Sequence, residues 1–193
     1  MPNLNSDLTF IEETHEYFLG LKRLPSVSEI MKPLTELALS YVPQRQLEIA
    51  RDRGIKVHQA IEDYIKFDLF DEEVGNYLDQ FILMLVENDL QVIESELRLT
   101  DGEYAGTLDL IVKDTQNRLG IIDTKTTYSI AKYVGVQLAA YELLAKHNSY
   151  DIKWTKIFHV KEDWYELRTI LPDTEKWRNL LAEYQNAKDQ YFE

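Results

Sequence analysis

Two stretches predict the centre of the fold: AGTLDLIV at residues 105–112 and GIIDTK at residues 120–125. Both are rich in apolar and β-branched residues, which favours β-strands. Because side chains two positions apart on a strand lie on one face, Leu108, Leu110 and Val112 are expected to form an apolar row with Asp109 on the opposite face. By the same rule Asp123 and Lys125 share a face.

These strands carry charged residues in surroundings apolar enough to be buried on both faces. A buried carboxylate is costly unless it is paired, protonated or bound to metal. Mg²⁺ and Mn²⁺ prefer oxygen ligands, which Asp109, Asp123 and the main-chain carbonyl of Thr124 would supply. Lys125 would then orient a water, favour its hydroxide form or stabilise charge on a phosphate. A structural Asp–Lys ion pair is the alternative, and the two strands alone leave both interpretations open.

The segments around these strands predict a single α/β domain. Strands are expected at 91–99, 104–113, 119–125, 153–160 and 164–170, and a helix at 131–147, so that a sheet arranged mostly as a meander is flanked by helices. A terminal helix follows Pro172-Asp173. We expect one domain over 1–193, divided into an N-terminal extension at 1–42, a core at 43–170 and a C-terminal helix at 171–193.

The N-terminal extension is expected to hold a β-hairpin and a helix. Residues 8–11 and 17–19 are strand-like, with Gly20 and Pro25 marking turns. Ser26 with Glu29 forms a capping-box pattern, and the helix it begins would run towards Leu39. Residues 43–66 are also helical in pattern, with Gly54 as a point at which two helices can divide. Val74, Leu78, Phe81 and Leu85 mark a further amphipathic helix.

Composition excludes several classes of protein. The 193-residue chain has no cysteine, which excludes disulfides, thiolate zinc sites and iron–sulfur clusters. It has neither a secretory signal pattern nor an apolar run of the roughly 20 residues that span a bilayer. A cytoplasmic protein without a membrane role is expected.

The net charge of −13 argues against broad, sequence-blind coating of nucleic acid, because such binding depends on a basic surface. On charge alone, a protein-binding or small-molecule role would be favoured. A nuclease is compatible with this acidity if the excess carboxylates lie away from the substrate and bound cations neutralise those at the centre.

The order of motifs resembles a known family. The sequence GTLD at 106–109, followed by IDTKT at 122–126, is similar to the core motif of PD-(D/E)XK nucleases, in particular of the RecB-like exonuclease branch. GIKVH at 54–58 resembles that branch's upstream helix with its metal-binding histidine, and QLAAY at 137–141 resembles its downstream Gln–Tyr motif. Residues 15–27 are similar to the start of phage-encoded members.

This resemblance implies a restriction-endonuclease-like fold with a central mixed β-sheet, and a site for one or two Mg²⁺ or Mn²⁺ ions. The implied metal ligands are His58, Asp109, Asp123 and the Thr124 carbonyl, with Lys125 and Glu96 as catalytic residues. Glu94 lies two residues from Glu96 and is the alternative to it. Asp123 departs from the family's more usual glutamate, and the cysteine-ligated iron–sulfur cluster of some members cannot form here.

The implied function is DNA exonuclease activity in phage or bacterial recombination, replication or repair. DNA is the expected partner, together with a recombination or replication protein. A catalytically inactive DNA- or protein-binding subunit and a structure-selective endonuclease are the alternatives. For the candidate DNA-binding residues the alternative is a structural or solvated role: these residues are Gln137, Tyr141, Arg53, Lys56 and Thr126.

Overall fold

The computed structural model describes residues 4–189 of the chain. Residues 1–3 of the expected 1–42 extension and residues 190–193 of the expected 171–193 segment lie outside this range. The elements of the extension are η1 (Leu4–Asp7), β1 (Leu8–Ile11), β2 (Glu16–Leu19), β3 (Lys22–Leu24), α1 (Val27–Ile30) and α2 (Lys32–Leu39). The remaining elements are α3 (Gln44–Phe67), η2 (Glu72–Val74), α4 (Gly75–Glu87), β4 (Gln91–Thr100), β5 (Ala105–Lys113), β6 (Leu119–Lys125), α5 (Val134–His147), β7 (Ile152–Val160), β8 (Tyr165–Thr169) and α6 (Thr174–Asp189).

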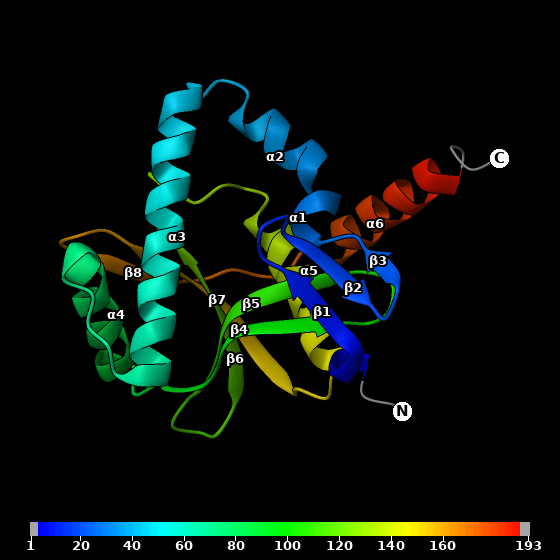
Figure 1. The fold of residues 1–193 in the computed structure, drawn as a ribbon. Helices are drawn as coiled ribbons and strands as arrows, with labels where there is room; N and C mark the ends of the chain where they lie inside the picture. The colour runs from blue at the N-terminus through cyan, green and yellow to red at the C-terminus, as the bar shows by residue number, and fades with distance from the viewer. Residues whose placement is uncertain (1–3, 190–193) are drawn as a thin grey trace.

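Within residues 4–189 the strands form two sheets. The larger sheet has the order β4-β5-β6-β7-β8, in which only the β6–β7 pair is parallel. Helix α5 makes the crossover that a parallel pair requires. The smaller antiparallel sheet, β1-β2-β3, projects from the front of the molecule (Figure 1). The α/β class and the mixed sheet flanked by helices are therefore confirmed, and the expected hairpin gains a third strand.

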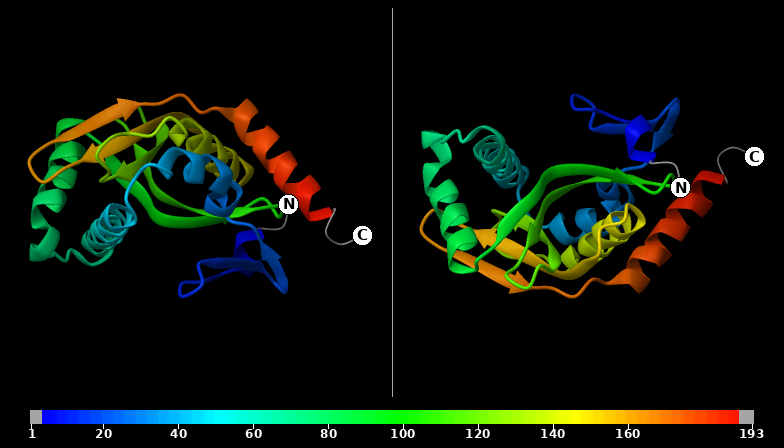
Figure 2. Two further views of the ribbon diagram at one scale, coloured as in Figure 1. Left: turned by 90° about the horizontal axis from the view of Figure 1, so that it is seen from above. Right: turned by 90° about the horizontal axis from the view of Figure 1, so that it is seen from below.

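Helices cover both faces of the larger sheet with separate apolar cores. On one face α5 and α6 bury Leu138, Leu144 and Trp177 against the strands. On the other, α3 and α4 bury Val57 and Phe81. Figure 2 shows α3 and α4 at one end of the molecule and α6 at the other. Among the described residues, no helix combines the length and hydropathy needed to cross a bilayer.

The helix expected over 43–66 is confirmed without the possible division at Gly54, whereas the expectation for Ser26 to Leu39 is wrong. Helix α3 is continuous through Gly54, because an internal glycine costs only about 1 kcal/mol and burial of Val57 and Ile61 supports the helix beyond it. The helix expected from Ser26 to Leu39 is instead divided into α1 and α2 at Met31. Pro33 has no N–H to donate and fits best in a first helical turn, so a new helix begins there. The cap is as expected, since Ser26 Oγ accepts a hydrogen bond from Glu29 N at 3.0 Å.

The apolar row expected on β5 is also wrong. Leu110 and Val112 pack in the core under α3 and α4, but Leu108 packs in the core under α5. The strict alternation of faces is therefore broken between Leu108 and Leu110, at Asp109. This irregularity lies next to the end of the pairing between β5 and β6.

Candidate metal and catalytic centre

The larger sheet splits between β5 and β6. Their antiparallel pairing runs from Lys113–Leu119 to Leu110–Ile122. Asp109 and Asp123 are the next residues on the two strands. Beyond this point β5 continues to pair with β4, and β6 continues to pair with β7. The two aspartates therefore stand at the opening of the split.

Three side chains meet on the β5 side of this opening. His58 Nδ1 lies 3.2 Å from Glu96 Oε1 and 3.7 Å from Asp109 Oδ2. One ligand atom from each residue lies within 4.8 Å of the others, which is close enough for all three to contact one cation. Helix α3 supplies the histidine, and its buried neighbours Val57 and Ile61 fix the orientation of that helix. These three residues are called the carboxylate–histidine group below.

An unusual backbone conformation brings Glu96 into this group. Its φ of 47° lies in the left-handed region, which non-glycine residues seldom adopt and which costs of order 1–3 kcal/mol. Glu94, the alternative, is directed elsewhere, since its Oε1 accepts a hydrogen bond from Tyr150 OH at 3.2 Å. The structure thus places Glu96 and not Glu94 beside His58, and the catalytic role of Glu96 remains a prediction.

Strand β6 also contacts the group through its backbone. Thr124 N donates a hydrogen bond of 2.7 Å to Asp109 Oδ2. Burial raises the pKa of Asp109, and the nearby Glu96 carboxylate adds to this effect while His58 opposes it. Burial by itself would lower the pKa of His58, but the charges of Asp109 and Glu96 outweigh burial and raise it to about 9. A site that holds a proton this strongly is also suited to a metal cation.

Asp123 and Lys125 form a second pair on the β6 side. Lys125 Nζ lies 2.6 Å from Asp123 Oδ2. The aspartate is 1% exposed, and neither of its carboxylate oxygens receives a well-oriented hydrogen bond from any described residue. Burial raises the pKa of Asp123 to about 6 although Lys125 opposes the rise. Asp123 does not belong to the carboxylate–histidine group, so its predicted role as a metal ligand remains a prediction.

Lys125 is charged in this setting. Burial would lower the pKa of its amine, but the carboxylates of Asp123 and Asp109 outweigh burial and raise the pKa above its ordinary value. A protonated ammonium donates hydrogen bonds and stabilises anions; it does not accept a proton. Of the roles open to Lys125 from the sequence, stabilisation of a negative phosphate fits this charge state best.

The Gln–Tyr motif lies on α5 behind the opening. Gln137 Nε2 donates to Tyr141 OH at 3.3 Å. Burial raises the pKa of Tyr141 well above its ordinary value, and the charges of Asp123 and Asp109 add to this. Gly106 makes room for the ring, because a Cβ there would lie 2.9 Å from a Tyr141 ring carbon. The buried ring of Tyr141 therefore packs against β5 at Gly106. Among the described residues, its hydroxyl forms a hydrogen bond with Gln137.

The remaining predicted DNA-binding residues divide into two kinds. Arg53 Nη2 donates to Thr126 O at 2.9 Å, and the buried Thr126 also accepts at that oxygen from Lys161 Nζ at 3.0 Å. Lys56 is exposed and forms an ion pair with Glu73. Arg53 thus helps to hold the chain that follows β6, whereas Lys56 is engaged on the surface near η2.

Lys161 and His159 were not predicted from the sequence. Lys161 Nζ and His159 Nε2 lie 2.6 Å and 2.7 Å from Thr127 O, and so both support the segment after Lys125. They come from β7 and its end, more than thirty residues away in the chain. Parallel pairing of β6 with β7 brings them close, and a single sequence carries no motif for that contact.

Comparison with known proteins agrees with this architecture. The profile of the PD-(D/E)XK nuclease superfamily matches residues 80–193. The chain therefore belongs to the PD-(D/E)XK nuclease superfamily. The match includes Glu96, Asp109, Asp123 and Lys125, and it begins after α3, so His58 lies outside it.

Among solved structures, the chain is similar to one titled "Crystal structure of SSO0001". The sequence identity is 14%, the alignment covers 80% of this chain and 82% of that chain, and the TM-score is 0.37. No curated protein matches the sequence.

Proposed function

We propose that this protein is a Mg²⁺- or Mn²⁺-dependent deoxyribonuclease that hydrolyses phosphodiester bonds. One observation carries the proposal: a carboxylate–histidine group and a protonated lysine stand on opposite sides of the split between β5 and β6. A phosphate placed in the split would meet a cation-binding site on one side and an ammonium on the other. Membership of a nuclease superfamily supports a nucleic-acid substrate.

The donor set fits a divalent cation. Asp109 and Glu96 offer carboxylate oxygens, and His58 offers a ring nitrogen after it loses its proton. Asp123 adds buried oxygens that receive no well-oriented hydrogen bond from the described residues. A bound Mg²⁺ or Mn²⁺ supplies a Lewis acid that offsets these charges and polarises the phosphate.

The protein's own groups then have separate tasks. Thr124 N holds Asp109 Oδ2 in place at 2.7 Å. Asp123 holds the Lys125 ammonium at the edge of the split at 2.6 Å. From there the ammonium can donate to a non-bridging phosphate oxygen as negative charge builds up, an interaction typically worth about 10²–10³ in kcat when lost from a catalytic site.

We further propose exonuclease action and a RecB-like affiliation, which the order of the motifs from His58 to Tyr141 supports. A role in phage or bacterial recombination, replication or repair, alongside a partner protein in the cytoplasm, follows from the same resemblance. An inactive nuclease-fold subunit is the alternative that the net charge of −13 favours. The intact set of carboxylates, histidine and lysine favours an enzyme.

A cleavage assay tests the proposal directly. Labelled linear DNA and covalently closed circular DNA are incubated with the protein in Mg²⁺, in Mn²⁺ and in EDTA. We expect metal-dependent release of nucleotides from linear DNA and no cleavage of closed circles. Cleavage of circles would replace exonuclease with endonuclease action, and absence of cleavage from every substrate with either metal would overturn the enzymatic proposal.

A further inference from the structure

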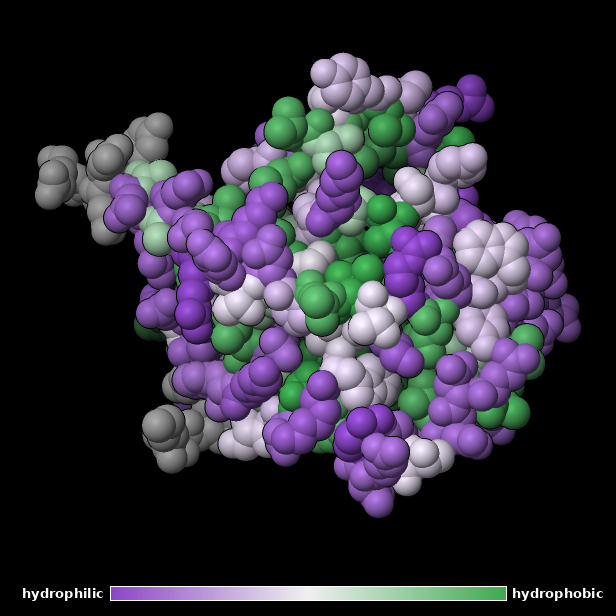
Figure 3. Space-filling view, turned by 180° about the vertical axis from the view of Figure 1, so that it is seen from behind, coloured by the Kyte–Doolittle hydropathy of each residue, from purple (hydrophilic) through white to green (hydrophobic). Residues whose placement is uncertain are grey.

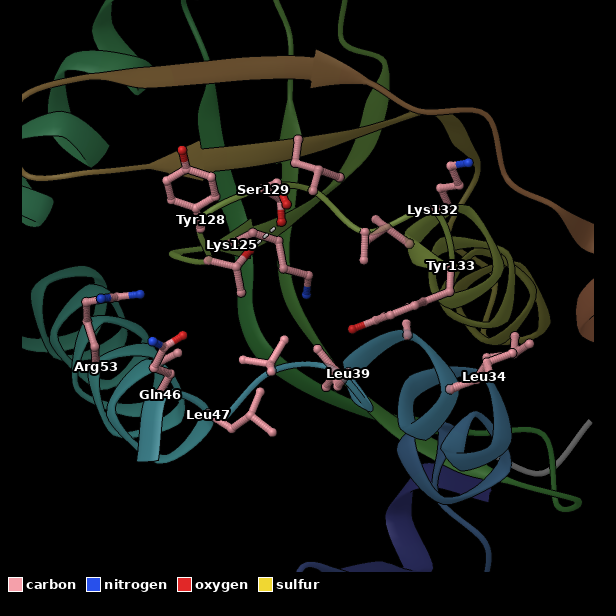
Figure 4. Close-up of a pocket in the computed structure, with 18 of the residues that line it drawn as sticks. Leu34, Leu39, Gln46, Leu47, Arg53, Lys125, Tyr128, Ser129, Lys132 and Tyr133 are labelled. Carbon is pink, nitrogen blue, oxygen red and sulfur yellow. Dashed lines mark hydrogen bonds between the residues drawn. The ribbon is translucent and has the colours of Figure 1, made fainter. Parts of the chain in front are cut away.

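A cleft with a volume of about 780 Å³ opens beside Lys125. It lies between α2, the N-terminal half of α3 and the segment at 127–134 that follows β6 (Figure 4). None of the three members of the carboxylate–histidine group lines it. Lys125 therefore connects two spaces, the split that holds the proposed metal site and this cleft.

Apolar side chains line the walls of the cleft, and several of them are exposed to solvent. Leu34, Leu37 and Leu39 come from α2, while Leu47 and Ile49 come from α3. Leu37 is 72% exposed and Ile49 is 55% exposed. Hydrophobic side chains gather over the upper part of the rear face, where α2 and α3 approach each other (Figure 3). Clustered exposed apolar residues generally mark a binding surface.

The charge of the cleft is opposite to that of the chain. The protein has 34 acidic and 21 basic residues, yet none of the described residues lining the cleft is acidic. Four are cationic: Arg53, Lys125, Lys132 and Lys176. In a protein with a net charge of −13, such local separation favours an anionic ligand. An apolar peptide would need only the walls, whereas these cations call for a ligand with apolar and anionic parts together.

Two tyrosines complete the lining. Tyr128 is 95% exposed at the mouth, and the ring of Tyr133 extends into the space near Lys125 (Figure 4). Aromatic side chains beside cations form the usual surface for single-stranded nucleic acid, with bases stacking on rings and phosphates meeting the cations. In a duplex the base faces are already stacked, so these walls would have nothing to contact.

We propose that this cleft holds the unpaired bases next to the phosphate at the metal site, so that the substrate is a single-stranded end and not an intact duplex. The inference rests on the proposed nuclease function and specifies its substrate. The cavity has the volume of pockets that enclose small organic groups, which suits one or two bases. Lys125 is the shared residue that places the adjoining phosphate in the split.

The test measures binding without cleavage. The full-length protein is titrated in EDTA with a short fluorescein-labelled oligothymidylate and, separately, with a blunt GC-rich duplex of equal length, by fluorescence anisotropy. Ile49→Glu places a negative charge in the cleft, and Ile55→Glu is its matched control on the same helix, where Ile55 is 61% exposed and outside the lining. Tyr128→Ala is paired with Phe67→Ala, since Phe67 is 65% exposed and also lies outside the lining.

We expect oligothymidylate to bind more tightly than duplex. Loss of one stacking or apolar contact should weaken its Kd by roughly 5- to 100-fold for Ile49→Glu and Tyr128→Ala. The two controls should leave the Kd unchanged, and because all four positions are exposed, circular dichroism should show no change of fold.

The outcomes separate the two proposals. An active nuclease whose Kd for oligothymidylate is insensitive to both cleft substitutions would overturn the cleft inference. So would tighter binding of duplex, or conversion of an oligomer to a monomer by Ile49→Glu with no change of Kd, which would make the cleft an interface between copies. A protein that lacks nuclease activity but binds oligothymidylate through the cleft would instead overturn the nuclease proposal alone.

Discussion

The two sides of the split between β5 and β6 differ in how their charges are satisfied. On the β5 side, His58, Glu96 and Asp109 contact one another, and Asp109 also receives the amide of Thr124. On the β6 side, Lys125 Nζ lies 2.6 Å from Asp123 Oδ2, and no described residue gives either Asp123 oxygen a well-oriented hydrogen bond. The donor atoms of the first side lie close enough to contact one cation, and the second side contains the cationic side chain of Lys125.

This difference indicates a division of labour. Negative groups that raise the pKa of a neighbouring histidine to about 9 are expected to attract a metal. A buried aspartate whose main neighbour is an ammonium is expected to keep that ammonium charged and in position. Metal binding and phosphate stabilisation should therefore be separable by substitution, although both sides lie at the same opening.

Substitution on the β5 side should have the largest effect. Asp109→Ala removes a carboxylate from the carboxylate–histidine group, so we expect loss of Mn²⁺ binding by calorimetry. We also expect kcat/KM to fall by at least about 10³-fold, since metal catalysis is worth several kcal/mol. Glu94→Ala is the matched control, because Glu94 pairs with Tyr150 outside the group. Equal losses from the two variants would refute the assignment of the metal site to this side.

Substitution on the β6 side should reduce rate without reducing metal affinity. Lys125→Met keeps the length of the side chain and removes its charge, so kcat on linear DNA should fall by about 10²–10³. The Kd for Mn²⁺ should stay near the wild-type value. Lys153→Met, at an exposed lysine paired with Asp151, is the control for loss of a positive charge. If Mn²⁺ affinity falls in parallel with kcat, the two sides act as one site and the comparison fails.

The smallest effect should be a pH-dependent change in stability. The folded protein holds a proton on His58 up to a pKa of about 9, above the ordinary value of 6.5, so this contribution to stability is complete below pH 6.5 and is lost as pH rises towards 9. The pKa of Asp123 is likewise raised, to about 6, so its contribution to stability is lost as pH rises from about 4 to about 6. The His58 side chain is 29% exposed, so solvent screens part of this effect. The free energy of unfolding should therefore fall by on the order of 1 kcal/mol between pH 6.5 and pH 9, less than the whole change in the His58 pKa would give.

Thermal melting in EDTA and in Mg²⁺ measures this effect. Metal must displace the proton from His58, so the rise in Tm caused by Mg²⁺ should grow as pH increases from 6 towards 9. His58→Asn should flatten the pH dependence in EDTA. A Mg²⁺ effect that is the same across this range would show that His58 does not contact the ion.

Most of the fold followed from local patterns. The strands that contain Asp109 and Asp123, the helix ending near His147 and the Ser26 cap were all predictable, because hydrophobic period, turn residues and capping act over a few neighbouring residues. The differences from the expected helix boundaries also have local causes. Gly54 did not interrupt α3, because glycine lacks a side chain but keeps its backbone N–H. Pro33 did divide α1 from α2, because proline has no backbone N–H to donate to the preceding turn.

The residues of the candidate site could be proposed from the sequence, and their roles stay predictions, but their geometry could not be. The residue types at positions 58, 96, 109, 123 and 125 were recognised from spacing and resemblance. Their division into two groups was not, because it depends on where the pairing of β5 with β6 ends and on the left-handed backbone of Glu96. The supporting contacts of Lys161 and His159 likewise arise from parallel pairing between strands separated by a helix.

The sequence by itself determined that two aspartates and a lysine would stand in buried strands of an α/β protein, since strand periodicity and apolar content act locally. Only the tertiary structure decided that Asp109 joins His58 and Glu96, that Asp123 faces Lys125, and that an apolar cleft without described acidic residues opens beside them. The physical reason is that both the ion contacts and the cleft form between elements distant in the chain. Their geometry is set by the packing of α2, α3 and β4–β7, and no local pattern encodes it.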